Sequence, residues 1–89
     1  MIKQPLTIIN KLGLHARAAA KLTGVSTRFS CTTELTANGK TVDCKSVMSL
    51  MLLAASKGTE IEIITNGHDE TEAMEAISTL INNRFDEAE

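Results

Sequence analysis

The sequence has almost no aromatic residues. It contains no Trp or Tyr and only two Phe among 89 residues, and its formal net charge is −2. Proteins that bind nucleic acid need a basic face for the phosphate backbone, and single-strand binders stack bases on aromatic side chains. The composition therefore argues against nucleic acid as a partner. The hydrophobic fraction is 43%, so the core of the protein must be built from aliphatic residues and Met.

Long hydrophobic runs are also missing. The longest uninterrupted apolar run, residues 50–55, is far shorter than the roughly 20 residues that a membrane-spanning helix needs. Residues 1–10 contain a single Lys, and Gln4 and Pro5 interrupt their apolar positions, unlike a secretory signal. We therefore expect a cytoplasmic protein that does not insert into membranes.

Cysteine is scarce. Cys31 and Cys44 are too few and too irregularly spaced for a zinc motif or a disulfide framework. They flank Asn38 and Gly39, a dipeptide typical of a two-residue hairpin turn. Such a turn places Cys44 opposite Thr33, so that Cys31 is at best a diagonal neighbour. We predict two half-buried, unpaired thiols in a reducing compartment.

Clusters of metal ligands are equally rare, and His68, Asp69 and Glu70 are the nearest candidate. Adjacent residues in a turn rarely converge on one ion. Carboxylates at the start of a helix also have another role, since they stabilise its positive end, and Asp69 and Glu72 have the spacing of a capping box. We expect neither a metal ion nor another cofactor.

The hydrophobic periodicity predicts one domain over residues 1–89 with the order strand, helix, strand, strand, helix, strand, helix. The predicted strands and hairpin cover residues 5–9, 29–45 and 59–65. The predicted helices cover residues 16–27, 46–58 and 68–85. Because each helix has one apolar face, we predict an α+β open-faced sandwich (βαββαβα), in which three helices cover one face of a four-stranded, mostly antiparallel sheet. The acidic tail, residues 86–89, is expected to be frayed.

A histidine stands where a loop becomes a helix, in the stretch GLHAR at residues 13–17. If Ala16 opens the helix, the unpaired N–H groups of the first turn face the side chain of His15. The positive helix end favours a neutral, nucleophilic imidazole and stabilises an anion such as a phosphoryl group on the ring. Arg17 can pair with phosphate oxygens. The residues alone leave an alternative open, in which His15 is an ordinary helix cap and Arg17 a solvated side chain.

Two segments resemble the motifs of a known family. GLHARAAA at residues 13–20 resembles the active-site motif of HPr, the histidine-containing phosphocarrier family of the bacterial phosphotransferase system. GKTVDCKSVMSLMLLA at residues 39–54 resembles the second motif of that family, around a regulatory serine. The resemblance covers essentially the whole chain in length, element order and motif spacing. The stretches at residues 10–17, 46–58 and 82–87 look more like the nitrogen-branch carrier than the sugar-branch carrier.

The resemblance implies a phosphohistidine carrier rather than a stand-alone enzyme. His15 would accept a phosphoryl group on Nδ1 from phospho-Enzyme I, itself charged by phosphoenolpyruvate, and would pass it to a histidine of an Enzyme IIA domain. Ala16, Arg17 and Ala18 would bind the phosphoryl group, and the protein would act as a monomer. Many members have Pro where this chain has Ala18. Ala is a good helix former, so we expect function to survive with a slightly looser helix start.

Ser46 matches the serine that an HPr kinase phosphorylates in some family members, which weakens docking to Enzyme I. A phosphate at a helix N-terminus is electrostatically favourable, but Ser46 is equally well explained as a helix N-cap. This serine supports an alternative function, a regulatory binding module of the same fold that transfers no phosphoryl group. The retained pair of His15 and Arg17 argues against that alternative.

The predicted second helix carries more apolar side chains than a core requires. Leu50 and Leu53 take core spacing, with Val47 or Ala54 beside them, which leaves further apolar residues facing outward. Exposed apolar side chains usually mark a docking surface, and Met adapts to several partners. In the family this surface extends to the His15 helix. The predicted docking residues are Ala20, Lys21, Val47, Met48, Met51, Leu52 and Ala55. The alternative is that these residues complete the core.

Overall fold

The computed structural model describes residues 1–88 and contains the predicted elements in the predicted order. The strands are β1 (Ile2–Thr7), β2 (Thr32–Ala37), β3 (Lys40–Asp43) and β4 (Glu60–Asn66). The helices are α1 (Ala16–Ser26), α2 (Val47–Leu52), α3 (Glu70–Asn82) and the short turn η1 (Arg84–Asp86). No helix among the described residues combines the length and apolar character of a membrane span.

The sheet has the strand order β1-β4-β2-β3, and all neighbouring strands are antiparallel. The predicted open-faced sandwich is therefore confirmed, with a sheet that is wholly rather than mostly antiparallel. Asn38 and Gly39 both have positive φ at the tip of the β2–β3 hairpin. The turn sets the predicted register, in which Leu35 faces Val42.

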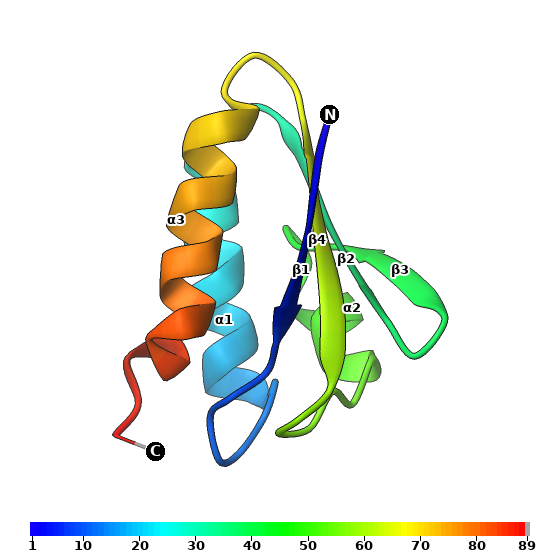
Figure 1. Ribbon diagram of the computed structural model, residues 1–89, viewed down its shortest axis with the longest axis vertical. Helices are drawn as coiled ribbons and strands as arrows, with labels where there is room; N and C mark the ends of the chain where they lie inside the picture. Colours follow the sequence, from blue (N-terminus) through cyan, green and yellow to red (C-terminus); the bar gives the residue numbers. More distant parts are fainter. Residues whose placement is uncertain (89) are drawn as a thin grey trace.

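The core lies between one face of the sheet and the helices. Figure 1 shows α1 and α3 side by side on this face, and α2 packs against α1 and β3. Strand β4 alternates, so that Ile61 and Ile63 are buried between exposed or half-buried neighbours. The apolar stripe of α3 is buried as predicted, through Ala73, Met74, Ile77, Leu80 and Ile81, and Phe85 beyond the helix joins it.

The boundaries of several elements differ from the prediction, and α3 ends at Asn82 rather than at residue 85. Strand β1 begins at Ile2 and includes Pro5, which is compatible with its position at the edge of the sheet. Helix α2 ends at Leu52 rather than near residue 58. Ala54 has a φ of 51°. The chain bends there, and the carbonyl of the next residue, Ala55, accepts a hydrogen bond from the loop before α1.

The predicted capping box at the start of α3 is wrong. The carboxylate of Asp69 accepts the backbone N–H groups of Ser30 and Cys31, each at 2.9 Å, and caps no amide of α3 within residues 1–88. These bonds tie the loop after α1 to α3. Glu70 instead accepts the Gly67 N–H at 3.1 Å and pairs with the N-terminal ammonium group. No group of three His, Cys, Asp or Glu side chains that could hold a metal ion exists among the described residues.

Both cysteines are unpaired and fully buried rather than half-buried, with 3% of Cys31 and none of Cys44 exposed. The N–H of Cys44 donates to Thr33 O at 2.9 Å, as the hairpin register predicts. Burial raises the pKa of the Cys44 thiol to about 12. This thiol is therefore an inert part of the core near neutral pH.

Candidate functional site

His15 is the N-cap of α1, which begins at Ala16 as predicted. Its backbone is extended, with φ −80° and ψ −179°, and its carbonyl accepts the first bond of the helix from Ala19 N at 2.8 Å. The ring turns back over the helix end, where Nδ1 accepts the Arg17 N–H at 3.3 Å. Since 27% of the side chain is exposed, the ring is accessible from outside.

The loop before α1 is held in place by its own backbone contacts. Gly13 has a φ of +69°, and a Cβ at this position would lie 2.5 Å from Ala55 O. Only glycine fits so close to a carbonyl in this conformation. The next residue, Leu14, donates its N–H to the same Ala55 O at 2.8 Å. The early end of α2 thus supplies the acceptor that positions the start of α1.

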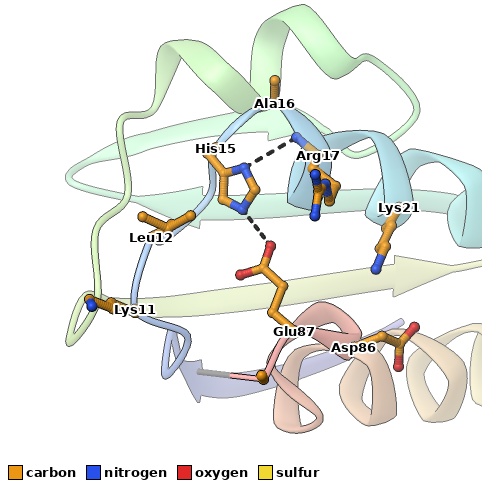
Figure 2. Close-up of a pocket in the computed structure, with 9 residues that line it drawn as sticks. Lys11, Leu12, His15, Ala16, Arg17, Lys21, Asp86 and Glu87 are labelled. Atoms are coloured by element: carbon orange, nitrogen blue, oxygen red, sulfur yellow. Dashed lines mark hydrogen bonds and ion pairs between the residues drawn. The ribbon is translucent and has the colours of Figure 1, made fainter.

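Glu87 is a member of the site that the sequence did not reveal. Its Oε2 lies 2.5 Å from Nε2 of His15, and its Oε1 accepts from Asn10 Nδ2 at 3.0 Å. Figure 2 shows the ring held between the Arg17 amide and this carboxylate. The prediction of a frayed tail is wrong for Asp86, which belongs to η1, and for Glu87, while Glu89 lies outside the described residues. Phe85 was the available signal, because a buried aromatic anchor directly before the tail brings the tail onto the protein.

A left-handed turn directs the tail toward His15. Arg84, Phe85 and Asp86 have φ values of 56°, 54° and 62°, a conformation that costs non-glycine residues roughly 1–2 kcal/mol each. Two contacts of Phe85, the central residue, hold this turn in place. The Phe85 ring is fully buried, and the backbone carbonyl of Phe85 accepts a hydrogen bond from Lys21 Nζ at 2.7 Å. Strained backbone persists only where surrounding contacts enforce it.

The ring lies in an open hollow of about 780 Å³. The lining residues are Lys11, Leu12, His15, Ala16, Arg17, Lys21, Asp86, Glu87 and Ala88. Burial opposes ionisation of Glu87, but the hydrogen bonds from Asn10 and His15 and the charge of Lys21 outweigh it and lower the pKa of this carboxyl. The hollow therefore combines lysine and arginine cations with an ionised carboxylate fixed at one edge of the imidazole.

The structure brings the three predicted phosphate-binding residues together in the first turn of α1. Arg17 and Ala16 are exposed, whereas the side chain of Ala18 is fully buried. The first amides of a helix have no carbonyl partner within it, so Ala18 can offer an anion its N–H but not its methyl group. The arrangement forms an anion-binding helix end beside Nδ1.

Ser46 is the N-cap of α2. Its Oγ accepts the Ser49 N–H at 3.2 Å, and its carbonyl accepts Leu50 N at 3.1 Å. The side chain is half-buried. The structural role predicted for Ser46 is thus confirmed, and any modifying enzyme must draw the hydroxyl out of this capping bond.

The predicted docking surface is only partly exposed. An apolar patch consists of Met48, Met51 and Leu52, which are 71%, 43% and 73% exposed. Ala20 is exposed, while Lys21 and Val47 are half-buried. Ala55 was wrongly included, since it is 3% exposed and lies beneath the loop that contains Gly13. Leu12 was missed, although it is 67% exposed at the rim of the hollow. Its place between Lys11 and the turn residue Gly13 was the available signal.

Comparisons of the sequence and the structure with known proteins both match HPr phosphocarriers. The sequence model described as "PTS HPr component phosphorylation site" matches residues 2–83. The phosphocarrier protein HPr of Pseudomonas aeruginosa is 55% identical over 85 residues, which cover 94% of each chain. This chain belongs to the HPr family of the phosphotransferase system. The family match stops before η1 and Glu87.

Solved HPr structures have the same fold. The crystal structure of HPr-C-His from Thermoanaerobacter tengcongensis covers 100% of both chains with a TM-score of 0.95 and 36% identity. A crystal structure described as an HPr dimer from the same organism matches with a TM-score of 0.78 and 37% identity, over 98% of this chain and 100% of that one. The expectation that this HPr-family chain is a monomer is therefore not confirmed.

Proposed function

We propose that His15 accepts a phosphoryl group on Nδ1 from phospho-Enzyme I and passes it to a histidine of an Enzyme IIA domain. The observation that carries this proposal is the position of Nδ1 at the N-terminus of α1, 3.3 Å from the Arg17 amide. The protein would relay phosphoryl groups in the cytoplasm, in the sugar or the nitrogen-related branch of the phosphotransferase system.

The helix end suits a group that must be held and then released. Phosphoryl transfer depends on positioning and charge stabilisation more than on covalent machinery. The Arg17 amide points at the atom that would carry phosphorus, and the Ala16 and Ala18 amides lie in the same turn. The Arg17 guanidinium supplies charge that can pair with phosphate oxygens. Because the site is an open hollow, a partner protein can reach the phosphoryl group.

The apolar patch is the part of the surface that we assign to partner docking. Met48, Met51 and Leu52 lie on α2, which packs against the helix that His15 caps. Flexible Met side chains suit a surface that must fit both a donor and an acceptor protein. Ala20 and Lys21 extend this surface along α1.

Ser46 is a second candidate for phosphorylation, by an HPr kinase. Its position at a helix N-terminus favours a phosphate, and α2 also carries the apolar patch, so a charge there would oppose docking. The purely regulatory alternative is less well supported, because the histidine and its anion-binding helix end are both present.

Intact mass after incubation with phosphoenolpyruvate and Enzyme I tests the carrier function. We expect the mass of one phosphoryl group to be gained and then lost in mild acid. His15→Ala should abolish the gain, while His68→Ala, which removes an exposed histidine, should leave it unchanged. Absence of any gain, with an Enzyme I that phosphorylates another carrier, would refute the proposal and direct attention to Ser46.

A further inference from the structure

We propose that Glu87 is a positioning residue that keeps the His15 proton on Nε2 and stabilises the positive charge that the ring gains when Nδ1 is phosphorylated. This inference deepens the proposed function and rests on it. It assigns a role to the C-terminal tail, which lies beyond the residues matched by the family.

The two hydrogen bonds of the ring define a single tautomer. Nδ1 faces the N–H of Arg17 and must therefore be an acceptor, while Nε2 faces an ionised carboxylate and must therefore be a donor. The neutral ring thus carries its proton on Nε2 and has its lone pair on Nδ1. Because the two nitrogens lie on opposite sides of the imidazole, the carboxylate does not occupy the position of an incoming phosphoryl group.

The buried side chain of Asn10 holds the Glu87 carboxylate in position. Asn10 is fully buried, and its Nδ2 donates both to Gly13 O at 2.8 Å and to Glu87 Oε1 at 3.0 Å. Its Oδ1 is buried without a hydrogen-bond partner among residues 1–88. The fold thus leaves a buried oxygen unsatisfied, at an energetic cost, while two donor hydrogens hold the loop and the tail together.

The Glu87 carboxylate faces two hydrogen-bond donors, Asn10 Nδ2 and His15 Nε2. A glutamine side chain, which is neutral and nearly the same size, cannot accept from both. One oxygen accepts from Asn10 and the other from His15, so both neighbours require an acceptor. A glutamine has one oxygen and one NH₂ group, and it would oppose a donor to a donor in either orientation. The site therefore discriminates between Glu and Gln, although the two side chains have nearly the same shape.

The chemical consequence follows from the charge of the ring. In the transfer step the Nδ1 lone pair leaves its hydrogen bond with the Arg17 N–H and forms the N–P bond, while the bond between phosphorus and the donor atom breaks, its electron pair returning to the donor. The released Arg17 N–H can then donate to an oxygen of the phosphoryl group. The proton stays on Nε2, so the imidazole changes from neutral to positively charged. A carboxylate hydrogen-bonded to Nε2–H stabilises this charge, as the orienting carboxylate of a catalytic triad does.

Glu87→Gln and Glu87→Ala test the proposal, with Glu75→Gln as the matched control, because Glu75 is an exposed carboxylate on α3 that does not line the hollow around His15. Circular dichroism first establishes that each variant is folded. Proton NMR then detects the downfield resonance that Nε2–H gives when it is hydrogen-bonded to a carboxylate. We expect this resonance in the wild type and in Glu75→Gln, and its loss in both Glu87 variants.

The second readout is the initial rate of phosphoryl gain with phosphoenolpyruvate and Enzyme I. We expect both Glu87 variants to be slower by about tenfold, the lower end of the range for removal of a residue that orients a functional histidine. Glu75→Gln should stay within about twofold of the wild type, since it removes the same charge from a surface outside the hollow, where salt screens its effect on His15. A resonance that persists in the Glu87 variants would overturn the pairing, and equal rates in all variants would overturn the chemical role. A wild type that gains no phosphoryl group would instead overturn the proposed function and the chemical role of Glu87 together. The Nε2–H resonance would still show whether His15 and Glu87 are hydrogen-bonded.

Discussion

Replacing Gly13 with Ala tests how the fold positions His15. The new methyl group would lie 2.5 Å from Ala55 O and 2.8 Å from Ser56 Cα. Both neighbours are backbone atoms, so neither can turn aside as a side-chain end would. The φ of +69° adds the cost of a left-handed conformation for a residue with a Cβ.

The magnitude follows from the contacts that must change. The left-handed conformation costs roughly 1 kcal/mol, and disruption of the bond from Leu14 N to Ala55 O costs about another 1 kcal/mol. Displacement of the packed backbone brings the expected loss in the free energy of unfolding to about 3 kcal/mol. Since Leu14 precedes His15 directly, the rate of phosphoryl gain should also fall.

Urea denaturation measures this loss, and Gly24→Ala is the matched control. Gly24 lies within α1, and apart from its chain neighbours and the backbone of its own helix no atom comes within 4 Å of the position of its Cβ. Ala is the better helix former, so this change should stabilise the protein by about 0.5–1 kcal/mol. Opposite signs for the two substitutions would support the reasoning. A loss below about 1 kcal/mol for Gly13→Ala would show that the close approach to Ala55 does not fix the loop.

Three further substitutions probe other parts of the molecule. Leu52→Ser should raise the KM of Enzyme I for this protein about tenfold in steady-state transfer. The free energy of unfolding should change little, and a shift beyond about 0.5 kcal/mol would contradict the exposed position of Leu52. Ser46→Ala should lower the free energy of unfolding by about 1 kcal/mol in urea, unless the bond to Ser49 contributes nothing. The hydrogen bond from Ser30 N–H, aided by Cys31, lowers the pKa of Asp69 against partial desolvation. A carboxyl with a lowered pKa stabilises the fold above its unfolded value and loses this effect as the pH falls through its folded value. Asp69→Asn should therefore have a lower Tm than the wild type at pH 7, and the gap should narrow as the pH falls below 3.8, the ordinary pKa of the carboxyl; a gap that stays constant below that pH would refute this.

The features that local rules govern were predictable from the sequence. The Asn-Gly turn set the hairpin register, the apolar stripe of α3 had helical spacing, and His15 preceded a helix whose first turn it caps. Each depends on residues that lie close together in the sequence. The end of α2 was not predictable in this way. Its helical pattern continues past Leu52, but the chain bends at Ala54 because Ala55 must meet the loop before α1.

The contact between Glu87 and His15 was not predictable either, because it also joins segments that lie far apart in the sequence. It joins the tail to Asn10 and His15 through a left-handed turn, and no local preference favours three successive non-glycine residues with positive φ. The sequence supplied Phe85 as an anchor but not the direction of the chain after it. Acidic residues at a chain end are usually solvated, which is why the tail was expected to be frayed.

The substitution at position 18 can now be interpreted through these contacts. Pro in the first turn would fix φ and stiffen the start of α1, and its absence led us to expect a looser helix start. In this chain the start of α1 is held from outside the helix. Leu14 is bonded to Ala55, the ring of His15 is bonded to Glu87, and the Ala18 methyl group is fully buried in the core. These contacts restrain the residues on both sides of the helix start, so we expect them to hold His15 in place without a Pro at position 18.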